Sequence, residues 1–220
     1  MLYIIASPIG NLGDISMRAL EVLKTVDSAA SEDTRRTRKL FDHYGITTPL
    51  MSYHDHSSPQ KREKLIGDLQ DGKKLALISD AGTPLINDPG FKLVKRCIEE
   101  KIEITAVPGP CSPINAIVLS GLGTDRFIYW GYLPHKSGKR KKDLEYLLSL
   151  SITAVVLESP HRIVKALDEM QGILGDRQIA VCREMTKKFE EIFRGTSREA
   201  YEHFSKATVK GEFVVVISSK

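Results

Sequence analysis

The sequence predicts an α/β protein made of two α/β domains with parallel and mixed sheets. Short apolar runs alternate with amphipathic stretches along all 220 residues, which is the pattern of alternating strands and helices. Several apolar runs break into loops rich in glycine and proline, and the alternation is interrupted once, at 121–125, before it restarts. A composition of 41% hydrophobic and 27% charged residues is that of a globular protein and excludes disordered and fibrous classes.

The first half of the chain reads as strictly alternating strands and helices, which predicts a parallel sheet. In the expected helix 15–25, Ile15, Ala19 and Leu23 share one face, and Asp14 or Ser16 can cap its start. Pro59 stands at the first position of another amphipathic segment, where its fixed φ favours a helix. We expect strands at 2–6, 27–31, 49–52, 75–79 and 103–107, and helices at 15–25, 34–43, 59–70, 90–100 and 112–121.

The second half keeps the alternation at first and then departs from it. Val164, Leu167 and Met170 repeat with the helical period. The segment 190–194, which mixes charged and apolar residues, and the apolar run 213–217 indicate antiparallel strands in a mixed sheet. We place the domains at 1–121 and 122–220. We expect strands at 127–132, 153–158, 178–183, 189–194 and 212–218, and helices at 139–149, 161–173 and 197–205.

Three strand ends open into small, flexible loops. The run 75–78 breaks into Ser-Asp-Ala-Gly-Thr-Pro, the run 2–5 into Ala-Ser-Pro-Ile-Gly, and the run 104–107 into Pro-Gly-Pro-Cys-Ser-Pro. Glycine permits close backbone approach and proline fixes a turn. Because carboxyl ends of parallel strands share one edge, the loops predict one crevice. The alternative is three ordinary connections between strands and helices.

Composition limits the environment of the protein. Cys97, Cys111 and Cys182 are widely spaced and form no C-x-x-C pair, which argues against disulfides or a zinc cage and favours a reducing cytoplasm. No apolar run reaches the ~20 residues of a membrane span, and Met1 directly precedes an apolar strand, so we expect neither membrane association nor a signal peptide.

The net charge of +4 is concentrated in two basic clusters. Each cluster can contact a phosphate backbone, or it can be a solvated loop or helix face. The clusters consist of Arg35, Arg36, Arg38 and Lys39, and of Lys136, Lys139, Arg140, Lys141 and Lys142.

Several common motifs are missing. The first loop is not a G-x-G-x-x-G fingerprint, and neither a G-x-x-x-x-G-K-[ST] phosphate loop nor a G-x-S-x-G elbow occurs, which disfavours NAD enzymes, P-loop NTPases and α/β-hydrolases. The run Tyr53-His54-Asp55-His56 contains metal-ligand residue types, but adjacent residues of an extended segment point to opposite sides. We therefore expect a polar loop there and no metal.

Polar groups follow three further strands. Residues 31–37 read Ser-Glu-Asp-Thr-Arg-Arg-Thr, which is both a helix cap and a set of charges suited to a polar substrate. Residues 158–162 and 182–188 each combine a carboxylate with basic groups and hydroxyls. Such groups can orient a nucleophile or hold phosphates, or an Arg–Glu pair can brace the loops.

Taken in order, six segments resemble a known family. They are L-Y-I-I-A-S-P-I-G-N-L-G-D-I-S-x-R-A, S-E-D-T-R-R-T, S-D-A-G-T-P-L-I-x-D-P-G, V-P-G-P-C-S, E-S-P-H-R and C-R-E-M-T-K. The resemblance is to the tetrapyrrole-methylase superfamily, also called class III S-adenosylmethionine methyltransferases. Within it, the chain is similar to the bacterial enzymes that methylate a ribose 2′-hydroxyl of a cytidine in 16S rRNA. The likeness covers essentially the whole chain.

The resemblance implies two α/β domains with S-adenosyl-L-methionine in a cleft between them. It also implies a homodimer that acts on 16S rRNA in the small ribosomal subunit. Many members continue into a small helical extension past the final strand, and we expect any RNA affinity from such an extension to be missing here. The implied donor contacts are Pro8, Ile9, Asp80, Gly82, Thr83, Ile86, Ser112, Pro113 and Leu157.

In ribose methylation, a base can accept the hydroxyl proton late in the transfer, and cationic side chains can hold phosphates. Candidate bases are Glu158, His161 and Glu184; candidate phosphate contacts are Arg35, Arg36, Arg162, Arg183 and Lys187. One alternative is a tetrapyrrole or other small-molecule methylase of the same superfamily, which the arginine-rich segment and the 7% aromatic content disfavour. The other is a non-catalytic nucleotide- or RNA-binding module.

Overall fold

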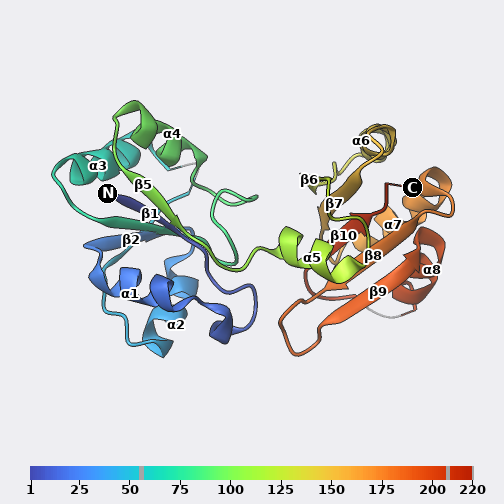
Figure 1. The fold of residues 1–220 in the computed structure, drawn as a ribbon, viewed down its shortest axis with the longest axis horizontal. Helices are drawn as coiled ribbons and strands as arrows, with labels where there is room; N and C mark the ends of the chain where they lie inside the picture. The colour runs from blue at the N-terminus through green and yellow to red at the C-terminus, as the bar shows by residue number, and fades with distance from the viewer. Residues whose placement is uncertain (55–56, 207–208, 220) are drawn as a thin grey trace. The chain divides into compact units, whose positions relative to one another are not determined.

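The computed structural model describes residues 1–54, 57–206 and 209–219. The chain divides into two compact units, Met1–Cys111 and Ser112–Lys220. Figure 1 follows the chain through both units, which are described separately below. The α/β class with parallel and mixed sheets, predicted from the alternation of elements, is confirmed.

The first unit contains a parallel sheet with the strand order β3-β2-β4-β1-β5. All of its strand pairs are parallel, so every strand ends at the same edge of the sheet. The strands β4, β1 and β5, from which the three open loops leave, are direct neighbours. The bounds are β1 (Leu2–Ile5), β2 (Ser28–Ser31), β3 (Leu50–Ser52), β4 (Leu75–Ile78) and β5 (Ile104–Val107).

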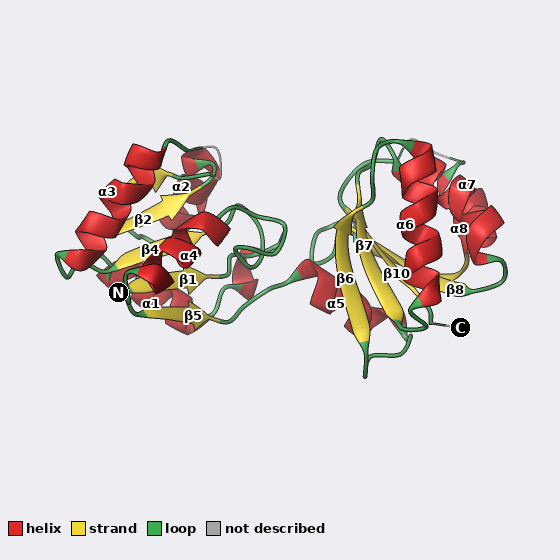
Figure 2. Ribbon diagram, turned by 90° about the horizontal axis from the view of Figure 1, so that it is seen from above, coloured by secondary structure: helices red, strands yellow, loops and turns green. Residues whose placement is uncertain are grey.

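Helices cover both faces of this sheet (Figures 1 and 2). The helices α1 (Met17–Thr25) and α2 (Thr34–His43) pack over one face, and α3 (Pro59–Gln70) and α4 (Phe91–Glu99) pack over the other. Ser16 caps α1 and Asp33 caps α2, each through a side-chain oxygen that accepts a backbone N–H. A short 3-10 turn, η1 (Leu12–Asp14), lies in the loop after β1.

The second unit contains a mixed sheet with the order β6-β7-β10-β8-β9. The strands β6 and β7 are parallel, whereas β10 runs antiparallel to both β7 and β8. The predicted antiparallel strands near the C-terminus are thus confirmed. The bounds are β6 (Phe127–Tyr132), β7 (Thr153–Glu158), β8 (Gln178–Arg183), β9 (Glu191–Thr196) and β10 (Phe213–Ile217).

One face of the mixed sheet supports α6 (Ser137–Ser149), α7 (Ile163–Leu174) and α8 (Ser197–Phe204), as Figure 2 shows. The other face is covered by α5 (Ser112–Ser120), which packs on β10, β8 and β7. This contact corrects the sequence-based boundary at 121/122. Helix α5 was expected to close the first domain, but its buried side chains Ala116 and Ile117 belong to the second unit, so the division falls at 111/112.

Among the residues that the structure describes, no helix combines the length and apolar composition that a membrane span requires.

Candidate functional site

The three open loops of the first unit are joined to one another by hydrogen bonds. The N–H of Ser7 donates to the carbonyl of Gly82 at 2.8 Å, and the N–H of Gly82 donates back to the carbonyl of Ser7 at 3.1 Å. The hydroxyl of Thr83 donates to the carbonyl of Pro110 at 3.0 Å. The predicted meeting of the three strand ends at one edge is therefore confirmed for this unit.

Two glycines allow the loops of this cluster to pack closely against one another. Gly82 adopts φ +89°, and a Cβ atom there would lie 3.3 Å from Cγ2 of Ile9. A Cβ atom at Gly109 would lie only 2.9 Å from that of Ala6. Leu85 and Asn87 also have positive φ, at 70° and 64°, which is rare for residues with side chains and concentrates at ligand sites.

Two buried serine hydroxyls near the loop cluster have no hydrogen-bond partner among the residues that the structure describes. Ser7 lies in the loop after β1 and Ser31 ends β2, and these two strands flank β4. Neither hydroxyl was predicted as a site residue from the sequence. The sequence shows only a small polar residue at the end of an apolar strand, which does not by itself indicate a ligand site. The structure adds that both hydroxyls are buried and unpaired, and this makes them candidates for ligand contacts.

Asp80 joins the loop after β4 to the segment after β2. One carboxylate oxygen accepts the N–H of Asp33 at 3.0 Å, and the other lies 3.8 Å from Nε of Arg36. Asp80 was predicted from the resemblance as a donor contact. In the structure its carboxylate also holds the start of the arginine-rich helix α2, because it accepts the N–H of the N-cap residue Asp33.

The arginine-rich segment is both a helix cap and an exposed cationic surface. The carboxylate of Asp33 accepts the N–H of Arg35 at 2.9 Å and pairs with its guanidinium through bonds of 3.0 and 2.8 Å. The hydrogen bonds from the Arg35 side chain and N–H lower the pKa of Asp33 to about 2. The side chains of Arg35 and Arg36 are 88% and 66% exposed, so both can still meet an anion.

The other first-unit residues predicted to contact the donor lie in these same loops. Pro8 is half-buried, Ile9 is buried beside Gly82, and Ile86 is exposed. The remaining predicted donor contacts lie in the second unit: Ser112 and Pro113 begin α5, and Leu157 is half-buried in β7.

The second unit also gathers its predicted polar residues at one sheet edge. Glu158 ends β7 and Arg183 ends β8, and both align with Phe213 of the intervening antiparallel strand β10. The edge therefore carries the Glu158–Arg162 group and the Arg183–Lys187 group.

Glu158 is enclosed rather than accessible. Its residue is 1% exposed, and its carboxylate accepts the N–H of Ser159 at 3.1 Å and an N–H of Arg162 at 2.9 Å. Burial raises the pKa of Glu158, although the Arg162 guanidinium opposes this shift. These contacts match the alternative interpretation of an Arg–Glu pair that braces the loop, whereas neighbouring His161 is exposed.

The Arg183–Lys187 group is likewise internally paired. Glu184 accepts hydrogen bonds from Lys187 at 2.8 Å and from the N–H of Glu212 at 2.9 Å. Burial opposes ionisation, but these hydrogen bonds outweigh it and lower the pKa of Glu184. Arg183 donates to the carbonyl of Lys210 and to Glu191.

The predicted basic cluster at 136–142 needs one correction. Arg140 is buried, because its guanidinium pairs with Glu169, so it contributes no surface charge. Asp55 and His56 of the polar run considered for metal binding lie outside the described residues. Within the described ranges, no group of three or more His, Cys, Asp or Glu side chains could hold a metal ion.

Each of the two α/β units brings loops and polar side chains together at one edge of its sheet. The chain belongs to the tetrapyrrole (corrin/porphyrin) methylase family, whose model matches residues 1–201.

Within this family, the chain is similar to several proteins that are named as small-subunit ribosomal RNA methyltransferases. The chain is 44% identical to ribosomal RNA small subunit methyltransferase I of Halalkalibacterium halodurans, over 98% of this chain and 75% of that protein. It is 47% identical to the protein of the same name from Synechocystis sp. (99% and 78%) and 45% identical to that from Escherichia coli O157:H7 (98% and 77%).

Solved structures share the fold at low sequence identity. A diphthine synthase superposes with a TM-score of 0.76 at 14% identity, over 99% of this chain and 89% of that one. A cobalt precorrin-4 methyltransferase superposes with a TM-score of 0.69 at 16% identity, over 99% and 94%.

Proposed function

We propose that the protein is an S-adenosylmethionine-dependent methyltransferase that methylates a ribose 2′-hydroxyl of a cytidine in 16S rRNA. Family membership and relatives named for small-subunit rRNA methylation support this proposal. The observation that carries it is the hydrogen bond between Asp80 and Asp33, which ties the glycine-containing loop after β4 to a helix with exposed arginines. Such an arrangement suits a small-molecule donor beside a polyanionic acceptor.

The loop cluster fits S-adenosylmethionine in its chemistry. Gly82 and Gly109 let the loops pack closely against Ile9 and Ala6, and the unpaired hydroxyls of Ser7 and Ser31 offer buried polar partners. We assign donor binding in the first unit to Pro8, Ile9, Asp80, Gly82, Thr83 and Ile86, and in the second unit to Ser112, Pro113 and Leu157.

S-adenosylmethionine supplies a methyl group on a sulfonium, which the ribose oxygen takes while neutral sulfide leaves. Because the methyl group is already activated, the main work of the chain is alignment of the reacting atoms. Alignment can account for ~7–11 kcal/mol of barrier lowering. The hydrogen bonds between the loops of Ser7, Gly82 and Pro110 hold the loops in one arrangement and suit them to this task.

Among the three candidate bases, the contacts favour His161. Glu158 is enclosed and paired with Arg162, and Glu184 is stabilised as an anion by Lys187, which weakens it as a proton acceptor. The imidazole of His161 is exposed at a strand end. Replacement of a general base lowers the rate by roughly 10²–10⁴-fold, and we expect His161→Ala to exceed Glu184→Gln in this effect.

Arg35 and Arg36 are the leading phosphate contacts because their side chains are exposed. Arg162, Arg183 and Lys187 are held by carboxylates. They stay in the proposal as secondary contacts that can offer only their remaining N–H groups. We further propose that the enzyme acts in the cytoplasm and forms a homodimer. Sedimentation of the purified protein tests the oligomeric state.

The deciding experiment incubates the protein with unmodified small ribosomal subunits and labelled S-adenosylmethionine, followed by mapping of the label. Label on a ribose of 16S rRNA supports the proposal. Label on a uroporphyrinogen-type substrate instead would indicate a small-molecule methylase, and donor binding without transfer would indicate a binding module.

A variant pair tests the role of the arginines. Arg35→Ala plus Arg36→Ala is expected to lower activity on subunits at least tenfold while donor affinity, measured by calorimetry, is retained. The matched control removes two exposed arginines elsewhere, Arg126 and Arg198. Equal loss of donor binding and activity would mean that the first pair is structural.

A further inference from the structure

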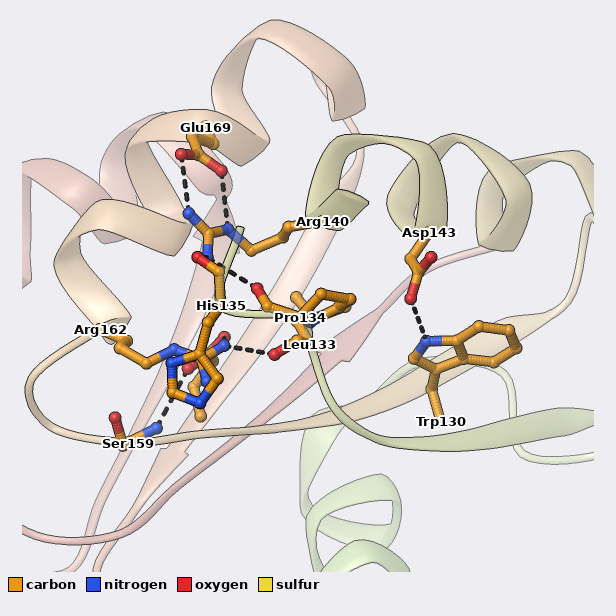
Figure 3. Close-up of polar contacts among 10 residues, drawn as sticks. Trp130, Leu133, Pro134, His135, Arg140, Asp143, Ser159, Arg162 and Glu169 are labelled. Carbon is orange, nitrogen blue, oxygen red and sulfur yellow. Dashed lines mark hydrogen bonds and ion pairs between the residues drawn. The ribbon is translucent and has the colours of Figure 1, made fainter. Parts of the chain in front are cut away.

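The loop that follows β6 is held from inside by two arginines, as Figure 3 shows. The guanidinium of Arg140 donates to the carbonyls of Pro134 at 2.9 Å and His135 at 3.2 Å. The guanidinium of Arg162 donates to the carbonyl of Leu133. Three successive carbonyls are thus bonded to cationic side chains, which fixes the path of the backbone into α6.

Each arginine is neutralised by a carboxylate of the same unit. Arg140, only 2% exposed, forms two bonds of 2.7 and 2.8 Å to Glu169 of α7. Arg162 donates to Glu158 at 2.9 Å. Since these guanidinium groups are paired within the unit, both arginines brace the loop and the start of α6.

The braced segment presents an exposed basic surface. Lys136 is the residue before α6, and Lys139, Lys142 and Tyr146 follow it at spacings of three or four residues; all four are exposed, whereas Leu144 is buried. We call Lys136, Lys139, Lys142 and Tyr146 the α6 basic face.

The aromatic member of this face is held in place. Tyr146 is 52% exposed, and the centroid of its ring lies 5.7 Å from that of Trp130. The indole N–H of Trp130 donates to Asp143 at 3.1 Å, so this carboxylate is already engaged (Figure 3). Glu145 stands four residues after Lys141 and three after Lys142, and at both spacings opposite charges attract on a helix.

We propose that the α6 basic face binds an unpaired segment of the rRNA substrate, with the lysines on phosphates and Tyr146 against a base. This inference rests on the proposed function and adds a contact surface that is separate from the Arg35–Arg36 pair. Lysines beside an exposed aromatic ring are the combination that single-stranded RNA requires. Because the braces order the backbone before binding, less conformational entropy is lost on association.

A membrane surface is a poorer match for the same charges. In α6, Leu144 and Leu147 are buried in the core of the unit and the half-buried Leu148 packs against that core, so the helix has no free aliphatic face to insert into lipid.

The test compares two triple variants with the same change of charge. Lys136→Gln, Lys139→Gln and Lys142→Gln together remove the proposed contacts, whereas Lys24→Gln, Lys64→Gln and Lys95→Gln remove exposed lysines of α1, α3 and α4. Affinity for unmodified small subunits is measured at several salt concentrations. Each lost contact to single-stranded RNA reduces the slope of log K against log salt by about 0.7, so the first variant should lose about 2.

We expect the α6 triple variant to bind subunits roughly tenfold more weakly at moderate salt, and the control variant to bind as the wild type. Calorimetry with S-adenosylmethionine should give the same donor affinity for all three proteins. Equal RNA affinity and equal salt slope in the two triple variants would overturn the proposal.

The aromatic contact is tested separately by Tyr146→Leu and Tyr146→Phe. Loss of base stacking should weaken RNA binding by about fivefold or more in the leucine variant without changing the salt slope, while the phenylalanine variant retains affinity. Thermal melts check that both fold. If both variants bind as the wild type, the ring makes no base contact and that part of the inference is wrong.

The proposed function can fail independently of this surface. In that case the wild-type protein would transfer no methyl group to rRNA, whatever its affinity for the subunit. An α6 triple variant that binds as the control does, while the wild type methylates normally, would reject only the α6 basic face.

Discussion

The two units fix their strand-end loops by different means. In the first unit, backbone hydrogen bonds between Ser7 and Gly82 and close glycine packing hold the loops together. In the second unit, buried ion pairs such as Arg140–Glu169 and Arg162–Glu158 hold them. In the first unit, side chains at the loop cluster would separate the loops, so glycines are needed there. In the second unit, the sheet edge presents surface charge, and charged side chains packed beneath that edge can hold it in place. The comparison makes different predictions for each unit.

The largest expected effect is in the second unit. Arg140→Met removes one partner of a buried pair and leaves the Glu169 carboxylate and two carbonyls without their donor. We expect the free energy of unfolding to fall by about 3–5 kcal/mol, measured by denaturant titration. Arg140→Met combined with Glu169→Leu should recover much of the loss, because no unpaired carboxylate remains. Equal destabilisation of the single and double variants would show that the pair is not the cause.

The first unit should respond most strongly to a side chain at Gly82. Gly82→Val imposes an unfavourable backbone conformation at φ +89° and brings new atoms against Ile9. Backbone strain of about 1–3 kcal/mol and lost access should weaken S-adenosylmethionine binding on the order of 10- to 100-fold, measured by calorimetry.

Gly67 provides the matched control for that variant. It lies in α3 with no neighbouring atom within 4 Å of an added Cβ. Gly67→Ala should leave donor binding unchanged and raise the free energy of unfolding by about 1 kcal/mol, because alanine favours a helix. Similar donor affinities for the two glycine variants would contradict the assigned loop cluster.

A smaller effect is expected at Asp80, which is assigned to donor binding and also holds the start of the arginine-rich helix α2. Asp80→Ala removes the acceptor for the N–H of Asp33 and the charge near Arg36, so donor binding and subunit binding should both weaken by about fivefold. Asp80→Asn keeps an acceptor oxygen and should preserve most donor affinity. Calorimetry and subunit binding separate these outcomes; identical defects in the two variants would mean that the charge alone matters.

The smallest effect is electrostatic and concerns Asp33. Its pKa is about 2 because Arg35 donates to its carboxylate, so the paired form adds stability above the unfolded value of 3.8. As pH falls through about 2, the carboxylate is protonated and that contribution is lost. Carboxyl NMR titration should find this pKa, and Arg35→Ala should move it toward 3.8. An unchanged pKa in the variant would rule out Arg35 as the cause.

Much of the fold could be read from local pattern. Alternation of strands and helices predicted the elements, and the strand-end loops predicted the meeting of Ser7, Gly82 and Pro110, because the carboxyl ends of parallel strands share an edge. The dual nature of residues 31–37 was also readable, since Asp33 is a helix cap and Arg35 remains exposed.

Tertiary structure decided where charged side chains lie. Arg140 sits within a run of lysines, and its burial depends on Glu169, which is 29 residues away on another helix. Glu158 resembles an accessible base in the sequence but is enclosed by the packing around Arg162. The assignment of α5 depends likewise on the sheet against which Ala116 and Ile117 pack. Period and turn chemistry are local properties of the chain, whereas the burial of a charge depends on partners that only folding brings together.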